Sequence, residues 1–363
     1  MQCMTTTVND RDRWNRFVVA SGKGHIMQSY EWGEVLKAQG WQPFRIAVMQ
    51  NNAIEAVMAV YLKKIPAMNT CIIYSPCGPV LNFTQEKIAD CLIEGAKKVG
   101  AENKAVFLQL FPNVLENDAA SIDAISGRGF VKIEKQGLLR LTQPSWVYKV
   151  DIGPSEKEIL GNMKKRTRYS INFSKKKGIT VEEKKSGDDL KLFYCMLREL
   201  GRRKNFPVRS FNYFRAIWKE MAPGGLARLF FAKHGDQVLA AEMAFVFGDT
   251  CYGMYRASSL KERNLRANYA LVWGVMTWAR ERNLKWYDLR GVASFNPPET
   301  HSGYGVFKFK EGFGGIPHTY IGDYYHIFDK KRYRLWQAAE TVFNRAGLKI
   351  INTFYKIRSR FME

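Results

Sequence analysis

One order of apolar runs and turns occurs twice in this chain, and this internal repeat limits the possible folds more than any single motif does. The stretches 44–62, "FRIAVMQNNAIEAVMAVYL", and 227–247, "ARLFFAKHGDQVLAAEMAFVF", align through a polar turn that joins two apolar runs. In both copies another strand, a helix and a further strand follow, and the copies lie roughly 185 residues apart. Strands and helices mixed in this way are typical of α/β or α+β proteins, in which helices cover mixed sheets.

The repeat predicts two tandem subdomains, each with one mixed sheet. We expect the first over residues 1–150 and the second over residues 151–328. The remaining segment, 329–363, is helical by pattern and rich in bases. A basic amphipathic helix can lie on a membrane surface, while packing on its own subdomain is an equally good interpretation of this segment.

The charge of the chain favours anionic partners. There are 56 lysines and arginines against 34 aspartates and glutamates, which gives a formal net charge of +22. A charge of this size attracts nucleic acid, anionic lipid head groups and phosphorylated small molecules. The N-terminus has no apolar signal region, and the most apolar helical stretch, 267–279, is too short to span a bilayer. We therefore expect a cytoplasmic protein, with peripheral contact at the inner membrane face as an option.

The strongest basic run lies at 161–177, and we expect it to form one helix. Seven bases precede any acid in this run: Lys164, Lys165, Arg166, Arg168, Lys175, Lys176 and Lys177. On a helix Lys165, Arg168 and Lys175 share one face, while Met163 and Ile171 face the other way. Such a face can neutralise phosphates along a nucleic-acid backbone, although a charged run can also be only a solvated surface.

Several catalytic motifs are missing from the sequence. There is no P-loop, no G-x-S-x-G and no H-E-x-x-H, and the cysteines and histidines show no zinc-ligand spacing. We expect neither a metal nor a bound cofactor. An acyl-CoA enzyme carries a glycine-rich pyrophosphate loop between a strand and a helix. The two equivalent stretches, 75–82 and 256–268, lack that spacing of glycines.

A glycine cluster at 303–324, "GYGVFKFKEGFGGIPHTYIGDY", is the best candidate for a reaction centre. Read as a strand, it places Phe307 and Phe309 on one face and Lys308 and Lys310 on the other. Glycines allow the backbone to approach a ligand closely. A lysine held near a reacting carbonyl can stabilise the developing oxyanion. We favour core packing for the rings and a functional role for one of the lysines.

Four stretches together resemble the FemABX-type peptidoglycan interpeptide-bridge transferases. They are "QSYEWGEVLKAQGW" at 28–41, "NMKKRTRYSINFSKKKGITVE" at 162–182, "VRSFNYF" at 208–214 and the glycine cluster at 303–324. The resemblance extends through about residue 328. It implies two packed GNAT-like (acyl-CoA N-acyltransferase-like) subdomains, in agreement with the repeat. Longer members insert a coiled-coil arm into the second subdomain; here only "GRRKNFPV" stands at that position, as in short members.

The resemblance also implies a reaction and its partners. Members of this family transfer an amino acid from aminoacyl-tRNA to the stem-peptide amine of a peptidoglycan precursor, which is either lipid II or UDP-MurNAc-pentapeptide. Two other function classes stay open at this stage. One is an acyl-CoA-dependent N-acyltransferase on the same fold, and the other is a non-catalytic protein that binds RNA or a membrane.

Where the local motifs match, the resemblance assigns substrate-binding residues. Lys37, in the helix "WGEVLK", resembles a lysine that contacts the phosphate of the precursor. Arg209 and Tyr213, in "RSFNY", resemble an arginine–tyrosine pair at the same diphosphate. Tyr252 or Tyr255, in "CYGMYRASS", resembles a tyrosine that lines the peptide channel.

Catalytic and tRNA-binding residues follow in the same way. Phe309 and Lys310 resemble a Phe-Lys pair beside the reacting ester, with Lys308 as the alternative lysine. Asp288 and Asp323 are the carboxylates available as a general base, and a hydroxyl of the terminal adenosine is the alternative proton shuttle. Without the arm, we expect the basic run to contact tRNA through four of its bases: Lys164, Lys165, Arg168 and Lys175.

Overall fold

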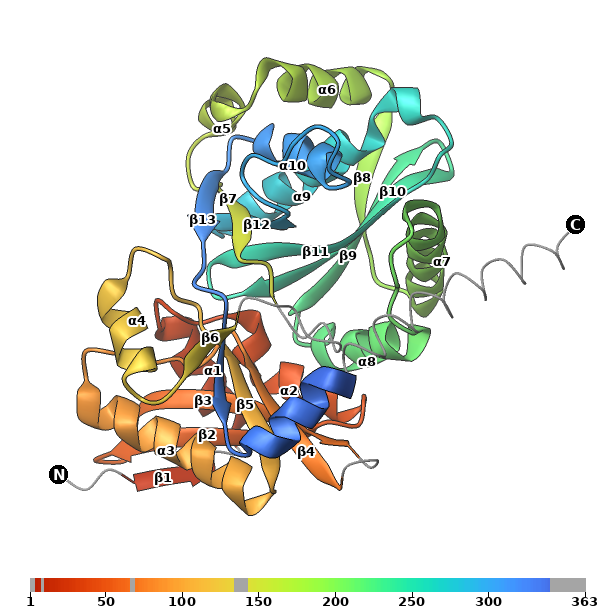
Figure 1. The fold of residues 1–363 in the computed structure, drawn as a ribbon. Helices are drawn as coiled ribbons and strands as arrows, with labels where there is room; N and C mark the ends of the chain where they lie inside the picture. The colour runs from red at the N-terminus through yellow and green to blue at the C-terminus, as the bar shows by residue number, and fades with distance from the viewer. Residues whose placement is uncertain (1–3, 8–9, 66–68, 134–142, 340–363) are drawn as a thin grey trace, which may run out of the picture. The chain divides into compact units, whose positions relative to one another are not determined.

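The computed structural model describes residues 4–7, 10–65, 69–133 and 143–339 and shows two compact units (Figure 1). The first unit consists of Met1–Asn9, Trp41–Gln143 and Ile321–Glu363. The second unit consists of Asp10–Gly40 and Pro144–Tyr320. Each unit contains a seven-stranded mixed sheet. None of the helices in the described ranges is long and apolar enough to cross a membrane.

The sheet of the first unit has the strand order β1-β2-β3-β4-β5-β14-β6. Among the strands described in this sheet only β4 and β5 pair in parallel, and α3 connects them. The elements of this unit are β1 (Met4–Thr7), β2 (Gln42–Gln50), β3 (Ala53–Ile65), β4 (Thr70–Pro76), α3 (Glu86–Glu102), β5 (Ala105–Phe111), α4 (Ala119–Ser126), β6 (Val131–Ile133) and β14 (Asp323–Ile327).

The sheet of the second unit has the strand order β13-β7-β12-β11-β10-β9-β8. Its strands are β7 (Trp146–Asp151), β8 (Ile179–Lys184), β9 (Ala227–His234), β10 (Gln237–Phe247), β11 (Thr250–Ser258), β12 (Trp286–Val292) and β13 (Ile316–Thr319). Its helices are α1 (Arg11–Ala20), η1 (Ile26–Gln28), α2 (Tyr30–Lys37), α5 (Glu156–Asn162), α6 (Lys165–Lys176), α7 (Gly187–Lys204), α8 (Phe211–Met221), η3 (Arg263–Leu265), α9 (Ala267–Arg280) and α10 (Tyr304–Glu311).

The internal repeat is confirmed by the connections within the two sheets. In each unit three antiparallel strands are followed by a parallel pair that a helix joins: β4-α3-β5 in the first and β11-α9-β12 in the second. The turns fit their sequence. Asn51 and Asn52 between β2 and β3 have φ values of 46° and 62°, which asparagine tolerates and a tight hairpin requires. At the equivalent turn between β9 and β10, Gly235 has a φ of +54°.

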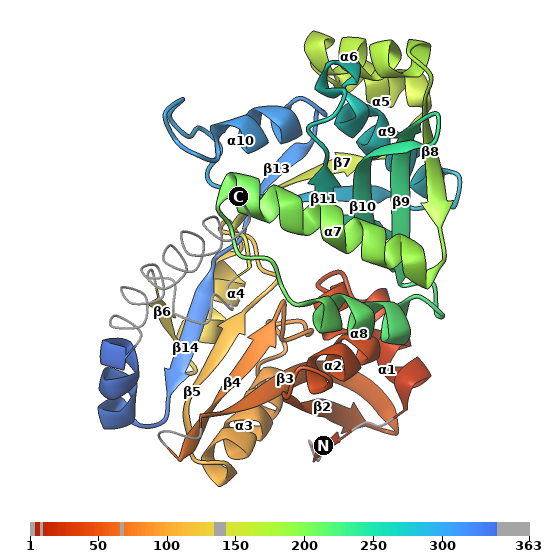
Figure 2. The same cartoon turned by 90° about the vertical axis from the view of Figure 1, so that its right-hand side faces the viewer.

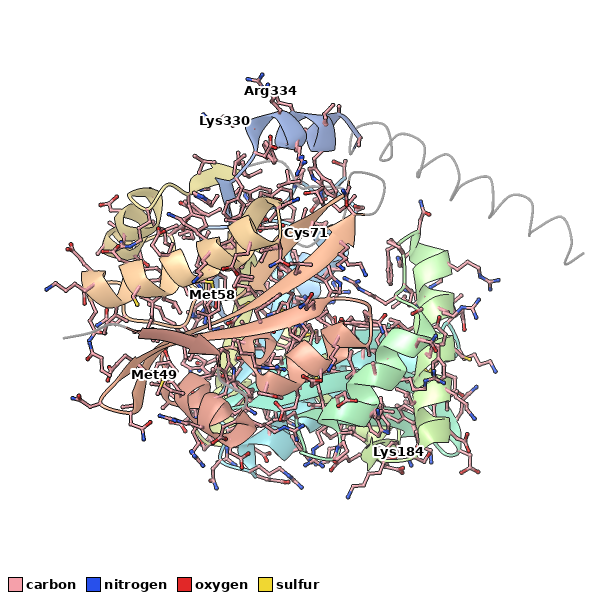
Figure 3. The ribbon with its side chains drawn as sticks, turned by 90° about the horizontal axis from the view of Figure 1, so that it is seen from below. Met49, Met58, Cys71, Lys184, Lys330 and Arg334 are labelled. Atoms are coloured by element: carbon pink, nitrogen blue, oxygen red, sulfur yellow. The ribbon has the colours of Figure 1, made fainter. Side chains whose placement is uncertain are left out.

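The two crossover helices bury apolar faces against their sheets. In α9, Leu271, Val272 and Val275 are fully buried, because this helix lies under the strands β8 to β11. In α3 the buried face includes Leu92, and Met58 of β3 lies beneath it in the core of the first unit (Figure 3). Burying one such side chain contributes about 1.5–3 kcal/mol, so these two helices hold the sheets in shape.

The division into units differs from the expected ranges 1–150 and 151–328 at both ends. Residues 10–40 belong to the second unit, where the ring of Trp32 packs against Phe245 of β10 at 6.2 Å. The strand β14 belongs to the first unit, since it pairs with both β5 and β6. Sequence order alone does not reveal that the chain crosses between its units more than once.

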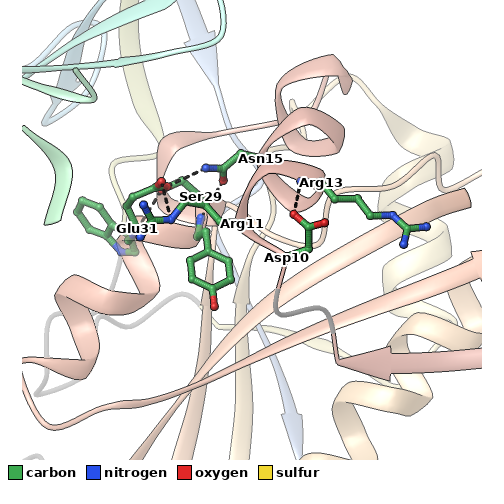
Figure 4. Close-up of polar contacts among 8 residues, drawn as sticks. Asp10, Arg11, Arg13, Asn15, Ser29 and Glu31 are labelled. Atoms are coloured by element: carbon green, nitrogen blue, oxygen red, sulfur yellow. Dashed lines mark hydrogen bonds and ion pairs between the residues drawn. The ribbon is translucent and has the colours of Figure 1, made fainter. Parts of the chain in front are cut away.

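The short helix α2 is fixed by a polar network at its start (Figure 4). Ser29 caps it by accepting from the amide of Trp32 at 3.1 Å. The buried Glu31 accepts from Asn15 Nδ2 at 2.8 Å and pairs with Arg11 at 3.5 Å. Asn15 in turn accepts from the amide of Tyr30 at 2.9 Å. Helix α1 thereby sets the direction of α2, which carries the predicted ligand Lys37 at its end.

The basic run at 161–177 is two helices and not the single helix expected. Helix α5 ends at Asn162, and α6 begins at Lys165 after an extended residue, Lys164. Nη1 of Arg168 reaches back and donates to the carbonyls of Leu160, Gly161 and Met163, which satisfies the free end of α5. The faces of α6 are as predicted, because its buried residues are Thr167, Ser170, Ile171 and Ser174.

The C-terminal segment is described only in part. Residues 330–339 are helical, and Tyr333 and Trp336 are buried in a cluster with Phe107 of β5. Lys330 and Arg334 point away from this cluster (Figure 3). The described part therefore packs on its own unit, and the rest of the predicted helix, 340–363, lies outside the described residues.

Candidate active site

The glycine cluster folds as a helix where we predicted a strand. Tyr304–Glu311 forms α10, and its side chains pair at helical spacing. The ammonium of Lys308 lies 5.6 Å from the ring of Tyr304, four residues earlier, and 3.4 Å from the carboxylate of Glu311, three residues later. The alternation of aromatic and basic residues misled us, because an aromatic-rich segment between glycines is a good helix when its rings find a core.

This correction separates the two candidate lysines. On a strand Lys308 and Lys310 would share one face, whereas on a helix positions two apart point in nearly opposite directions. Lys308 is half exposed and pairs with Glu311 on the surface. Lys310 turns inward, and its Nζ donates to the carbonyl oxygen of Gly291 on β12 at 2.6 Å. Of the two, only Lys310 reaches the interior of the second unit.

The surroundings of Lys310 lower its pKa from 10.5 to about 7. Burial is the main cause, because it disfavours the charged ammonium, and the nearby guanidinium groups of Arg256 and Arg290 add to it. The carboxylates of Asp288 and Glu242 act in the opposite direction. The amine is thus divided between its protonated and neutral forms near neutral pH, which suits a group that handles charge or protons during a reaction.

A buried ion pair lies behind Lys310. Glu242, a fully buried residue of β10, accepts from Nε of Arg256 at 2.5 Å and from the hydroxyl of Tyr287. Nη2 of Arg256 also donates to the Tyr287 hydroxyl at 3.2 Å. Gly253 makes room for the network, since a Cβ there would stand 2.6 Å from the Tyr287 oxygen. The guanidinium of Arg256 lies over the ring of Phe309 at 5.6 Å and so ties α10 to this network.

The strand β12 carries a bulge beside Lys310. Its pairing with β7 shifts register between Asp288 and Gly291, and Arg290 has a φ of +61°. The amide of Arg290 donates to Asp288 Oδ1 at 2.6 Å, while its guanidinium lies 3.6 Å from Asp288 Oδ2 and 3.3 Å from His25 Nε2. Both carboxylate oxygens of Asp288 therefore contact Arg290, so this candidate base stabilises the bulge of β12.

The other candidate base belongs to the first unit. Asp323, at the start of β14, accepts from Nε2 of Gln109 at 2.8 Å. Burial raises the pKa of Asp323 to about 6, although the hydrogen bond from Gln109 opposes the shift. The two carboxylates that the sequence singled out thus lie in different units, each with a partner that accounts for its burial.

A cavity of about 480 Å³ opens where β11 leads into α9. Phe309 and Tyr269 line it, so α10 contributes one ring to its wall. The charged lining residues are five bases and one acid: Arg203, Lys204, Lys261, Arg263, Arg266 and Glu262. A cavity of this size with a cationic rim and two aromatic rings fits an anionic ligand that also has a flat ring.

The predicted diphosphate residues come together in part. The guanidinium of Arg209 lies 5.1 Å from the ring of Tyr213, whose hydroxyl is 3.0 Å from that of Tyr255. Burial raises the pKa of Tyr213, so its hydroxyl keeps its proton. Lys37 is at the end of α2, a helix that packs against α8, and its ammonium is exposed and 3.9 Å from the Glu34 carboxylate.

The alternative tyrosine, Tyr252, occupies a neighbouring position. A bulge between β10 and β11 shifts the register between the pairs Met243–Tyr255 and Ala244–Gly253. Because of this extra residue, Tyr252 and Tyr255 lie on one face of β11 and Arg256 on the other. Tyr252 is buried and packs edge-on against His25 at 4.7 Å. It is therefore a neighbour of the Arg290 bulge, while Tyr255 belongs with Tyr213.

Three of the four predicted tRNA contacts have exposed side chains. Lys165 and Lys175 are exposed on α6, and Lys164 is half exposed with its Nζ 2.6 Å from Glu311 of α10. The guanidinium of Arg168 donates to carbonyls of α5, so in this structure Arg168 connects α6 to α5. The ion pair from Lys164 links the basic helix to the helix that carries Lys310.

Sequence reasoning missed the charged network behind Lys310. One signal was present: Glu242 is a lone acid within the apolar stretch "VLAAEMAFVF", where a charge needs a buried partner. Its partner Arg256 directly follows Tyr255 in the motif that the resemblance had already selected. Arg290 gave no such signal, because its role depends on a bulge that only the structure reveals.

The fold is that of known tandem acyltransferases. The chain matches the crystal structure of FemX with a TM-score of 0.84 at 22% identity, over 92% of this chain and 99% of that one. A tandem GNAT protein from the clavulanic acid biosynthesis pathway matches with a TM-score of 0.56 at 9% identity, over 89% of this chain and 98% of that one. These matches confirm the tandem GNAT-like fold with mixed sheets.

The chain belongs to the FemAB family, whose model matches residues 10–233 and 224–341. Curated relatives named lipid II:glycine glycyltransferase come from Staphylococcus haemolyticus, with 24% identity over 96% of this chain and 98% of its own length, and Staphylococcus saprophyticus, with 23% over 92% and 95%. The same protein of Staphylococcus aureus is 23% identical over 96% and 98%. Within the described ranges only residues 205–210 join α7 to α8, so no coiled-coil arm is inserted there.

Proposed function

We propose that this protein transfers an amino acid from aminoacyl-tRNA to the stem-peptide amine of a peptidoglycan precursor and so builds an interpeptide bridge. The curated relatives that match nearly the whole chain are glycyltransferases whose name specifies lipid II. Both lipid II and UDP-MurNAc-pentapeptide offer the diphosphate and the peptide amine that this reaction needs. Lipid II as the acceptor would bring the enzyme to the inner membrane face, whereas UDP-MurNAc-pentapeptide would leave it in the cytoplasm.

The observation that carries this proposal is the inward-pointing amine of Lys310, the residue that follows the cavity-lining Phe309. Phe309 lines the cavity, and the next residue, Lys310, points inward to the Gly291 carbonyl. Catalysis by Lys310 requires that the carbonyl oxygen of the aminoacyl ester take the place of the Gly291 carbonyl at the ammonium. Replacing a backbone carbonyl by a developing oxyanion strengthens the hydrogen bond from Lys310 in the transition state, which is the requirement for catalysis.

The reaction itself needs alignment more than activation. The acceptor nitrogen attacks the ester carbonyl carbon, the C–N bond forms as the C–O bond to the ribose breaks, and the proton of the nitrogen passes to the ribose oxygen. Since Asp288 is held by Arg290, the vicinal hydroxyl of the terminal adenosine is the better proton shuttle. Holding the two substrates in line can contribute about 7–11 kcal/mol to lowering the barrier.

The cavity also supports the donor class. Five bases on its rim fit the phosphates of an RNA 3′ end, and Phe309 and Tyr269 offer rings for its bases. For the acceptor, Arg209 and Lys37 supply cationic groups and Tyr213 and Tyr255 supply paired hydroxyls, as expected at a diphosphate.

A transfer assay with purified protein tests the proposal. Radiolabelled aminoacyl-tRNAs are offered with either lipid II or UDP-MurNAc-pentapeptide, with and without RNase. We expect label to move to one of the two acceptors and to be lost after RNase treatment. A donor tRNA without the vicinal hydroxyl should react much more slowly, and full activity with it would exclude the hydroxyl as proton shuttle.

Two competing functions predict other results. An acyl-CoA-dependent N-acyltransferase would acetylate an acceptor from acetyl-CoA, and the cavity lies where such enzymes bind their cofactor. Its loop, residues 259–266, contains no glycine to cradle a pyrophosphate. A non-catalytic binding protein would show no transfer with either donor, and replacing Lys310 would leave its affinity for RNA unchanged.

A further inference from the structure

We propose that Tyr169, Phe173 and Arg266 form a platform on which an unpaired RNA base stacks just outside the cavity. The platform would hold the single-stranded 3′ end of the donor as it runs from the cavity across α6. The inference rests on the proposed function in one respect, namely that the donor is an aminoacyl-tRNA. It names a binding site that is separate from the four lysine and arginine contacts expected on the basic run at 161–177.

The platform is defined by an exposed tyrosine in an unusual setting. The side chain of Tyr169 is 56% exposed, more than Trp146 or Phe206 at 38% each. Its ring stacks on that of Phe173, one helical turn later, with centroids 5.9 Å apart and planes 28° apart. A large aromatic ring left in water on a charged helix has a cost that a bound partner would remove.

Arg266 joins this ring pair to the cavity. Its guanidinium lies 5.0 Å from the centroid of Tyr169 and 5.4 Å from that of Phe173. The same residue lines the cavity, where it directly precedes α9. Figure 2 shows α6 beside α9, and the contacts between the two helices agree. A base stacked on Tyr169 would thus be adjacent to a ligand in the cavity.

The arrangement is held in place before any ligand arrives. Arg266 has a φ of +57° and donates from Nη1 to the Ser170 hydroxyl at 2.9 Å. The buried hydroxyl of Ser174 donates to the carbonyls of Leu265 and Arg266 at 2.7 Å and 3.0 Å. A strained backbone kept by several hydrogen bonds indicates that the position of the guanidinium matters.

The chemistry of the platform points to single-stranded nucleic acid. Aromatic rings, an arginine that packs on them and a basic surface together form the usual binding surface for unpaired bases. Lys177 lies 5.8 Å from the Phe173 ring, and Lys165, Lys175 and Lys176 are exposed along the same helix. In a duplex the bases already stack on one another, so only an unpaired segment can use the face of Tyr169.

The lining of the cavity next to the platform contains a buried acceptor and a buried donor. Among the described residues, Oδ1 of Asn268 is buried without a hydrogen bond, and Nη1 of Arg203 also has no hydrogen bond, although it lies 3.7 Å from the carboxylate of Glu199. A nucleotide carries complementary groups of both kinds on its base and ribose, and buried polar atoms usually have partners.

Binding of a short RNA tests the platform. The probe is a fluorescein-labelled single-stranded RNA that ends in the unpaired CCA of tRNA, measured by anisotropy over a series of salt concentrations. Stacking of one base is worth enough that Tyr169→Ala should weaken binding roughly 5- to 150-fold. Tyr169→Phe keeps the ring and should bind within about twofold of wild type, as should Val19→Ala, an exposed side chain on α1.

Salt dependence separates stacking from charge. Lys165→Gln should reduce the slope of log Kd against log salt by about one, whereas Tyr169→Ala should leave the slope unchanged. Loss of slope in Tyr169→Ala would mean that α6 itself is disturbed, and equal binding by Tyr169→Ala and wild type would overturn the platform. The same RNA annealed into a duplex should bind without dependence on Tyr169.

Two further measurements keep this inference distinct from the proposed function. Coenzyme A is added as a competitor; if it displaces the RNA at micromolar concentration, its adenine is the occupant and the RNA platform is wrong. Transfer of label is measured with the same variants. If wild type transfers label and Tyr169→Ala transfers it equally well, the platform is rejected and the proposed function stands. If RNA binding depends on Tyr169 but no label is transferred, the proposed function is rejected and the platform stands.

Discussion

The sheets of the two units have equivalent central strands, but the loops that lead from the first strand of each parallel pair into the crossover helix differ. In the first unit the loop between β4 and α3 is filled by its own apolar side chains, since Val80, Leu81 and Phe83 are all buried. Val80 also forms a β-bridge with Val57 of β3. In the second unit the equivalent loop, residues 259–266, is mostly exposed and borders the cavity of about 480 Å³.

The buried polar groups beside the parallel strands differ in the same sense. Among its described residues the first unit has one buried carboxylate, Asp323, which accepts a hydrogen bond from the neutral amide of Gln109. The second unit has Glu242 paired with Arg256, Asp288 paired with Arg290, and the inward amine of Lys310. The second unit thus has an open loop and more buried charged groups beside its parallel strands than the first unit, which is why we propose the reaction centre there.

The largest effect should come from the buried ion pair of the second unit. Glu242→Gln would leave the Arg256 guanidinium buried without its charge partner, which costs about 3–5 kcal/mol in free energy of unfolding. Urea unfolding of the variant and wild type measures this difference. Glu199→Gln, which removes an exposed partner of Arg203 at 3.7 Å, is the matched control and should change the free energy by about 0–1 kcal/mol. Equal effects of both substitutions would mean that Arg256 does not depend on Glu242.

Lys310 and Lys308 provide a test within one helix. Lys310→Met should lower kcat about 100- to 1,000-fold, as expected for the loss of one oxyanion donor. Lys308→Met removes an exposed ammonium two residues away and should change kcat less than about twofold. The transfer assay measures both, and thermal unfolding checks that both variants are folded. A larger effect from Lys308→Met would identify Lys308, the alternative lysine of the sequence analysis, as the catalytic one.

The two equivalent loops contain a matched pair of leucines. Leu81 in the first loop is 3% exposed, and Leu260 in the second is 49% exposed. Leu81→Ala should destabilise the protein by about 2–5 kcal/mol because it leaves a cavity, whereas Leu260→Ala should stay within about 0.5 kcal/mol. Urea unfolding measures both. A large loss of stability in Leu260→Ala would show that the second loop is packed like the first, and the difference between the two loops would then be wrong.

The repeat was visible in the sequence because it depends on local rules. Apolar runs, polar turns such as Asn51-Asn52 and the buried face of α6 all follow from residue spacing, and the structure confirms them. The family resemblance added Arg209, Tyr213 and Tyr255, which the structure brings into contact. Motif matching selected neighbouring residues here because they stand next to recognisable turns and helix starts, and their role at a diphosphate stays a prediction.

The rest depended on long-range packing that spacing does not encode. The segment at 304–311 alternates like a strand, yet its rings pack at helical spacing: Phe309 lies 5.1 Å from Phe313. The network of Glu242, Arg256 and Tyr287 joins residues from three strands, and two bulges decide which side chains face it. A bulge adds one residue to a strand, so the side chains beyond it point to the opposite face of the sheet from the one that simple alternation predicts. No local sequence pattern indicates where a bulge occurs.

The pH dependence of transfer reports on the charge of Lys310. Because the folded protein holds its pKa at about 7, the ammonium form decreases between pH 6 and pH 8. Lys310→Arg stays charged throughout, so the ratio of wild-type to variant kcat should fall by about tenfold over this range, with the titration of the acceptor amine cancelling. A ratio that rises with pH would identify Lys310 as a base that accepts the proton of the acceptor amine.

The smallest effect should come from the lone carboxylate of the first unit. Asp323 has a folded pKa of about 6, above its ordinary value of 3.8, so the folded state binds the extra proton between these values. The contribution of Asp323 to stability is therefore present at low pH and is lost as pH rises through about 6. Asp323→Asn should remove this pH dependence and change the free energy of unfolding at pH 7 by about 1 kcal/mol or less, measured by urea unfolding at pH 5 and pH 7. If Asp323→Asn instead lowered the free energy of unfolding strongly at pH 7, the ionised carboxylate would have a charged partner, and the first unit would contain a buried ion pair as the second does.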